Sequence, residues 1–140
     1  MTITLNIPDL APSLNGSKGL MRMHYQQYRR VRETWSTLAL SALRSHPEWR
    51  YLRRPVADRV SVEIERRYAS RPLDLDNLYA ASKVPLDALR RSGIIPDDDP
   101  ETVTALRCTQ VKVDRRAQQG TVITLRRDSA PQNARKPKTR

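Results

Sequence analysis

The sequence predicts an α+β fold, with a single mixed β-sheet of about four strands and two helices packed on one face. Residues 2–7 and 59–68 alternate apolar and polar side chains, as half-buried strands do. Residues 24–45 instead repeat apolar side chains at three- and four-residue steps, which is the period of a helix. The elements follow one another as β-α-β-α-β-β. One sheet with both helices on one face is the simplest way to bury every apolar side.

The first strand, TITLNI, is rich in β-branched residues and is followed by two prolines and a turn expected at Asn15-Gly16. In the first helix the arginines fall off the apolar stripe. We expect the helix to end at His46-Pro47, because a residue before proline disfavours helical geometry. The stripe consists of Tyr28, Val31, Trp35, Leu38 and Ala42.

The second strand, residues 59–68, has one apolar side, formed by Val60, Val62 and Ile64. A second helix should begin near Asp76 and end before Gly93. Pro85 lies inside this segment, and an interior proline removes a backbone hydrogen bond. The sequence therefore predicts a bend or a break at Lys83-Val84.

Two further strands are predicted at residues 103–113 and 120–126, joined as a hairpin through the polar turn DRRAQQG. Residues 129–140 contain no large apolar side chain and carry several Lys and Arg. We expect a single domain over residues 1–128, followed by a disordered basic tail over 129–140.

The charge of the chain points to a polyanionic partner. There are 26 Lys and Arg against 15 Asp and Glu, a net charge of +11, which suits nucleic acid. No apolar run is long enough to span a membrane, and the N-terminus does not resemble a secretory signal. The single cysteine, Cys108, excludes an internal disulfide and a Cys-rich zinc site. These features predict a cytoplasmic protein.

The acidic residues are concentrated in one part of this basic chain. Seven of the 15 fall within residues 74–101. Neighbouring carboxylates repel one another unless a cation offsets their charge. Carboxylates that hold a metal inside a phosphate-binding surface are typical of metal-dependent nucleases. The seven are Asp74, Asp76, Asp87, Asp97, Asp98, Asp99 and Glu101.

Spacing suggests which of these acids can share a metal ion. Asp74 and Asp76 are two residues apart after a strand, so in extended chain they point the same way, about 7 Å apart. Mg²⁺ prefers such hard oxygen ligands. If the second helix folds back over the sheet, one of Asp97, Asp98 and Asp99 can meet the pair.

A structural interpretation of the same residues stays open. Asp76 can cap the helix, and residues 97–99 before a proline can form a solvated turn. Lys83 and Asp87, four residues apart, can form an ion pair. Alternatively, Lys83 neutralises the carboxylates or binds the phosphate in the transition state.

Five short motifs occur together along the chain and cover most of residues 3–126. Three of them lie in the acidic region: D-L-D-N at 74–77, K-x-x-x-D at 83–87 and G-x-x-x-D-D at 93–98. The other two are P-S-L-N at 12–15 and His24-Tyr25 followed by basic residues and Trp35. In these motifs the chain resembles the RusA family of endodeoxyribonucleases, which resolve Holliday junctions.

The resemblance implies Mg²⁺-dependent cleavage of four-way DNA junctions by paired symmetric nicks, with Mn²⁺ as an alternative metal and no small-molecule cofactor. It implies a homodimer that acts in DNA recombination or repair, including that of prophages. The catalytic residues carry over to Asp74, Asp76, Asp98 and Lys83. The three aspartates would be the metal ligands, with Asp97 as second choice for Asp98.

Two departures from the family pattern stand out. Three additional residues between Asn77 and Lys83 would leave Lys83 about 60° off the original helix face and one turn further along. Tyr25 stands where a Trp is usual, which keeps an aromatic surface.

A phosphate-binding surface is expected at the start of the first helix, and its alternative is a solvated helix face. The competing functions are a non-catalytic basic nucleic-acid-binding module and a fork or flap nuclease of the same family. The candidate DNA contacts are Arg22, His24, Arg29, Arg30 and Arg32.

Overall fold

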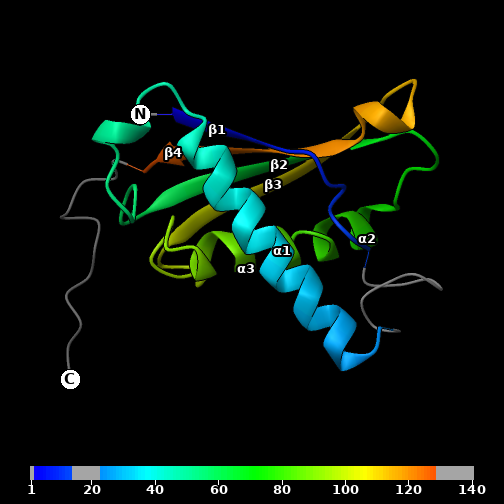
Figure 1. Ribbon diagram of the computed structural model, residues 1–140, viewed down its shortest axis with the longest axis horizontal. Helices are drawn as coiled ribbons and strands as arrows, with labels where there is room; N and C mark the ends of the chain where they lie inside the picture. The colour runs from blue at the N-terminus through cyan, green and yellow to red at the C-terminus, as the bar shows by residue number, and fades with distance from the viewer. Residues whose placement is uncertain (1, 14–22, 129–140) are drawn as a thin grey trace.

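Four strands form one mixed sheet in the computed structural model, which describes residues 2–13 and 23–128 (Figure 1). The strands are β1 (Thr2–Ile7), β2 (Val60–Tyr68), β3 (Val103–Lys112) and β4 (Gly120–Arg127), in the spatial order β1-β4-β2-β3. β4 is antiparallel to both of its neighbours, and β2 and β3 are parallel. The turn predicted at Asn15-Gly16 and the tail predicted at 129–140 lie outside the described residues.

Two longer helices pack together on one face of this sheet. α1 (Tyr25–Arg44) runs obliquely across the sheet and contacts both β1 and α3 (Lys83–Arg91) (Figure 1). A short helix, α2 (Leu75–Ala80), precedes α3. Two single 3₁₀ turns, η2 (Trp49–Tyr51) and η3 (Arg116–Gln118), lie in the connections. The predicted α+β class, with a four-stranded mixed sheet and two helices, is therefore confirmed.

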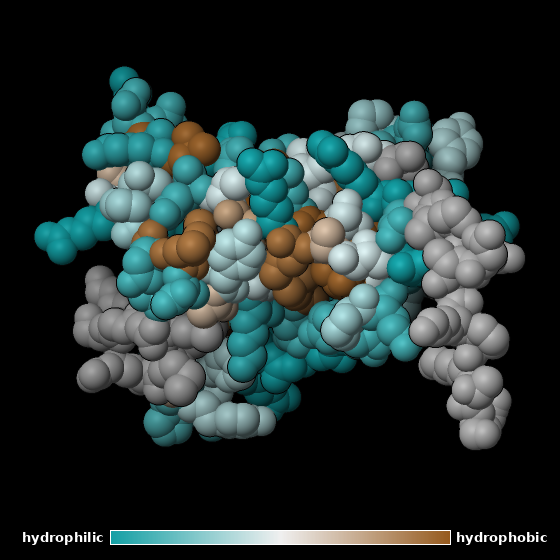
Figure 2. All heavy atoms as spheres, turned by 180° about the vertical axis from the view of Figure 1, so that it is seen from behind, coloured by the Kyte–Doolittle hydropathy of each residue, from teal (hydrophilic) through white to brown (hydrophobic). Residues whose placement is uncertain are grey.

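The core lies between the sheet and the two helices. Alternate residues of β1 and β2 are buried, as the period-two pattern predicted. From behind, hydrophobic side chains reach the surface over the middle of the molecule and hydrophilic ones surround them (Figure 2). The core side chains include Ile3, Leu5, Val60, Val62, Ile64, Ile123 and Leu125 from the sheet, and Trp35, Ala39, Val84 and Leu89 from the helices.

The predicted hairpin between the last two strands is wrong. β3 and β4 are not neighbours, because β2 lies between them and pairs with both. The connection over residues 113–119 is too long for a two-residue hairpin turn. It carries the chain past the end of β2, which lies between β3 and β4 in the sheet. β2, α2, α3 and β3 thus form a parallel crossover.

The predicted break in the second helix is present two residues earlier than expected. α2 ends at Ala80 and α3 begins at Lys83. Pro85 is thereby the third residue of α3, where a backbone N–H has no partner within the helix. The break lies upstream of Lys83 because a proline at the third position of a helix removes no hydrogen bond.

Two predictions from composition concern membranes and the single cysteine. Among the described residues, no helix combines the length and the apolar character that a membrane crossing requires. Cys108 is a free, buried thiol on β3. Burial raises its pKa to about 11.

Candidate active site and its basic surroundings

Asp74 and Asp76 lie at the N-terminus of α2, on the surface. Asp74 is the N-cap residue, and its Oδ1 accepts a hydrogen bond of 2.9 Å from the backbone N–H of Asn77. Asp76 lies in the first helical turn and is exposed. The residue that caps the helix is therefore Asp74, and not Asp76 as the sequence suggested.

This end of α2 is anchored to the sheet by a side chain of β3. Gln110 Oε1 accepts a hydrogen bond of 2.9 Å from the backbone N–H of Leu73, and Gln110 Nε2 donates one of 2.7 Å to its carbonyl oxygen. The side-chain amide of Gln110 thus holds both the backbone N–H and the carbonyl oxygen of Leu73, the residue immediately before Asp74. The acidic pair therefore occupies a fixed position beside the parallel strands β2 and β3.

The second acidic group follows α3 and forms a tight turn. Asp97 Oδ1 accepts from the backbone N–H of Asp98 at 2.7 Å, and Asp99 Oδ1 accepts from that of Thr102 at 2.9 Å. Asp97 and Asp98 are both exposed. The solvated turn that the sequence offered as an alternative is thus present, and it leaves two carboxylates on the surface.

The structure does not bring the two acidic groups together within one chain. Asp98 Oδ2 lies 3.8 Å from Nε of Arg90, in the last turn of α3, whereas α2 adjoins the first turn. A nine-residue helix is about 13 Å long, and α2 and the 97–99 turn lie on opposite sides of α3 (Figure 1). Over residues 2–13 and 23–128, no three His, Cys, Asp or Glu side chains are grouped so that they could hold a metal ion. The carboxylates of one chain, as described, do not fit a three-aspartate magnesium site.

Asp87 has a structural role at the interface between α1 and α3. Its Oδ2 lies 3.0 Å from Arg32 Nε and its Oδ1 lies 2.7 Å from Arg90 Nη2. Burial acts to raise the pKa of this carboxyl, but the hydrogen bonds from Arg32 and Arg90 outweigh that effect and hold the pKa below its ordinary value. Asp87 is therefore a charged cross-link between the helices.

Lys83 does not form the ion pair with Asp87 that its spacing allowed. The two arginines take the Asp87 carboxylate instead, and Lys83 is exposed with no ion pair among the described residues. Its position in the first turn of α3, next to the break after α2, leaves its ammonium group available to a ligand.

The expected DNA-contact residues of α1 fall into different classes. Arg32 is half-buried and paired with Asp87, with its guanidinium 5.5 Å from the centre of the Tyr28 ring, and the DNA contact expected of it stays a prediction. Arg29 forms an exposed pair with Glu33 at 3.2 Å.

The remaining candidates lie at or near the start of α1. Arg30 is exposed with no ion pair in the described part of the chain. His24 is the exposed N-cap residue, and its backbone N–H donates to Gln27 Oε1 at 3.4 Å. Arg22 lies outside the described residues.

One buried cation, Arg66, was not predicted from the sequence. It continues the inward side of β2 and is only 7% exposed. Its Nε donates to the Ala11 carbonyl oxygen at 3.0 Å, but its Nη1 is buried and has no hydrogen-bond partner among residues 2–13 and 23–128. The signal was present, because an arginine at position 66 falls on the apolar side of a strictly alternating strand.

The sequence matches none of the protein-family models and none of the curated proteins with which it was compared. The functional interpretation therefore depends on the chemistry of these residues and on the motif resemblance.

Proposed function

We propose that this protein is a metal-dependent, structure-selective endodeoxyribonuclease that resolves Holliday junctions by paired symmetric nicks. The observation that carries the proposal is the division of the motif acids into two kinds. Asp87 is half-buried and paired with two arginines, whereas Asp74, Asp76, Asp97 and Asp98 stay exposed in a protein of net charge +11. Exposed carboxylates on a protein with a large excess of positive charge suit a divalent ion and a DNA phosphate together.

Asp74 and Asp76 are the residues that would hold Mg²⁺ or Mn²⁺, since both are exposed and the chain before them is fixed by Gln110. Lys83 and the arginines at the start of α1 supply positive charge for the phosphate backbone. Arg29 and Arg30 are exposed there, whereas Arg32 is engaged with Asp87.

A homodimer is part of this proposal. A four-way junction has two strands to nick symmetrically, and a twofold dimer provides two sites in that relation. If Asp98 is to join Asp74 and Asp76, a second copy of the chain is the simplest source of the missing carboxylate.

The decisive experiment replaces Asp76 with Asn and follows a labelled four-way junction in Mg²⁺, in Mn²⁺ and in EDTA. We expect cleavage to fall to background while junction binding in EDTA is retained, because Asn has the shape of Asp but not its charge. Asp114→Asn, an exposed acid near η3, is the matched control and should cleave normally. Cleavage by the Asp76 variant at the wild-type rate would refute the proposal.

A non-catalytic DNA-binding module is the second candidate. The helix-capping role of Asp74, the turn hydrogen bond accepted by Asp99 and the separation of the acidic groups favour it. Such a module would shift the junction in a gel without cutting it in either metal. A fork nuclease of the same family would cut a replication fork at least as fast as the junction, so fork and linear duplex substrates belong in the same assay.

A further inference from the structure

Residues 49–55 combine exposed aromatic rings with arginines. Trp49 is 44% exposed and Tyr51 is 86% exposed, both on the 3₁₀ turn η2. Proteins seldom leave two large rings this close together in water without a use for them. Arg50, Arg53 and Arg54 are interleaved with them and are also exposed. None of the candidate metal ligands lies in this segment.

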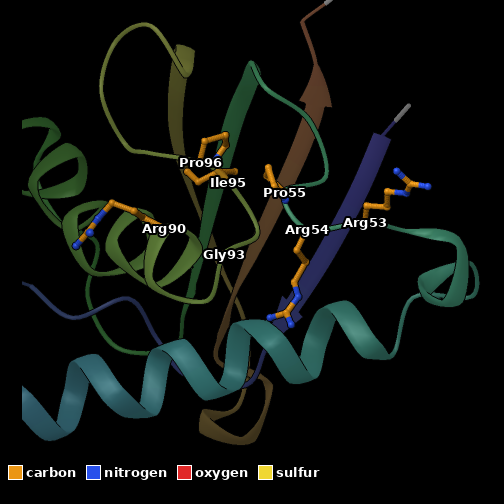
Figure 3. Close-up of a pocket in the computed structure, with 7 residues that line it drawn as sticks. All are labelled: Arg53, Arg54, Pro55, Arg90, Gly93, Ile95 and Pro96. Atoms are coloured by element: carbon orange, nitrogen blue, oxygen red, sulfur yellow. The ribbon is translucent and has the colours of Figure 1, made fainter.

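A cavity of about 720 Å³ opens beside this segment, between it and the chain that follows α3. Its arginines do not converge on one point: Arg54 reaches the Ser92 carbonyl at the end of α3, and Arg90 points away from Arg53 (Figure 3). Guanidinium groups spread in this way do not suit a single small anion. They suit a chain of phosphates that passes over the surface. The cavity is lined by Arg53, Arg54, Pro55, Arg90, Gly93, Ile95 and Pro96.

The charge around this cavity is positive. Arg90 is neutralised by Asp87 and Asp98, and Arg54 Nη1 donates to the Ser92 carbonyl oxygen at 2.9 Å while keeping its full charge. Arg50 and Arg53 have no ion pair within the described ranges, and no acidic residue of those ranges lines the cavity.

We propose that residues 49–55 and the adjoining cavity form a binding site for single-stranded DNA. Arginines would contact successive phosphates, and Trp49 and Tyr51 would stack on unpaired bases. The aromatic rings decide between single and double strands, since the base faces of a duplex are covered by stacking. The site extends the proposed function and depends on its action on DNA. It lies next to the 97–99 turn because Arg90 both lines the cavity and holds Asp98.

The two tryptophans provide a direct test. Trp35 is 2% exposed in the core and Trp49 is 44% exposed, so only Trp49 fluorescence should respond to a ligand on the surface. We expect a dT oligonucleotide, titrated in EDTA, to quench the fluorescence and to shield it from acrylamide. Trp49→Ala should weaken binding about tenfold, whereas Trp49→Tyr should restore most of it. Circular dichroism and thermal unfolding would show whether the variants fold.

Charge removal tests the phosphate contacts separately. Arg50→Ala with Arg53→Ala should lower the slope of log affinity against log salt by about 1.4, for two contacts to a single strand. The matched control is Arg115→Ala with Arg116→Ala near η3, at the opposite end of the molecule (Figure 1). It removes the same charge and should leave the slope unchanged.

Three results would overturn this site: no change of fluorescence with dT, equal losses in both double variants, or duplex binding as tight and as dependent on Trp49 as single-strand binding. EDTA keeps the test independent of cleavage. A protein that binds dT through Trp49 but never cuts a junction would contradict the proposed nuclease and retain the site. If the protein cuts junctions but dT does not change Trp49 fluorescence, the proposed nuclease is retained and the single-strand site is contradicted.

Discussion

At the scale of single residues, burial decides what the acids of one motif do. Asp87 belongs to the same motif as Lys83, yet its side chain is 16% exposed and held by two arginines from two helices. Asp76, 11 positions earlier, is exposed. Carboxylates that are alike in sequence therefore have different roles, because only some of them face a helix–helix interface.

Replacing Asp87 with Asn should lower the free energy of unfolding at pH 7 by about 2 kcal/mol, since two charge-assisted hydrogen bonds lose their anion. The native pKa of Asp87 is depressed, so its contribution is complete above about pH 4 and is lost as the pH falls further. Urea unfolding of both proteins from pH 7 to pH 2.5 should show their difference shrinking with acid.

Asp58→Asn is the control for this measurement, because Asp58 is exposed outside the helices. It should change stability by less than about 0.5 kcal/mol. An Asp87 variant as stable as the wild type at pH 7 would show that the cross-link between α1 and α3 contributes nothing.

At the scale of elements, the edge strand β1 depends on a glycine in its neighbour. A Cβ built on Gly120 of β4 would lie 2.7 Å from the carbonyl oxygen of Ile7, which is closer than real contacts allow. The backbones of β1 and β4 can therefore approach at this point only with glycine.

Gly120→Ala should accordingly destabilise the protein by about 1–3 kcal/mol, because the added methyl group forces the two backbones apart. Hydrogen exchange should locate the effect, with faster exchange in β1 and little change in β2 and β3. Thr124→Ala, which adds no atoms to the same strand, serves as control. Unchanged exchange in β1 would show that its backbone relaxes without cost.

At the scale of the whole molecule, the two acidic groups lie on opposite sides of α3. A three-carboxylate site assembled between two copies has a distinctive consequence. In a heterodimer of Asp76→Asn and Asp98→Asn, one composite site would have both substitutions and the other would have neither.

Mixing these two variants should therefore restore cleavage of one junction strand. Each heterodimer has one intact site of its two, so its rate should reach at most about half that of a wild-type dimer. A nicked product on a denaturing gel is the measurement. Mixing Asp74→Asn with Asp76→Asn is the control, because both substitutions then affect the same group and no site is intact. Absence of rescue in the first mixture would mean that each chain assembles its own site.

Local patterns carried much of the fold. The helix expected over residues 24–45 and the strand expected over 2–7 agree with the observed elements to within one residue, because alternation and helical period report directly on which side is buried. Proline likewise predicted the interruption near Lys83. The strand order was not accessible in this way, because β3 and β4 carry no local mark of the strand that separates them.

For the candidate site, too, local sequence patterns identified some residues, and contacts between distant segments decided the roles of others. Composition and motif spacing led to Asp74, Asp76, Asp97 and Asp98 as candidate metal ligands, which stays a prediction; the structure shows that all four are exposed. The sequence could not show that Arg32 forms an ion pair with Asp87, nor that Arg66 is buried, because both depend on contacts between distant segments.

The sequence by itself thus determined the elements, their inward sides and the acidic residues, since each of these follows from neighbours within about four positions along the chain. Only the tertiary structure decided that β2 lies at the centre, that Asp87 is a cross-link and that α3 separates the acids. The physical reason is that pairing and ion-pair partners are chosen by packing in three dimensions, where residues 55 positions apart, such as Arg32 and Asp87, come within hydrogen-bonding distance.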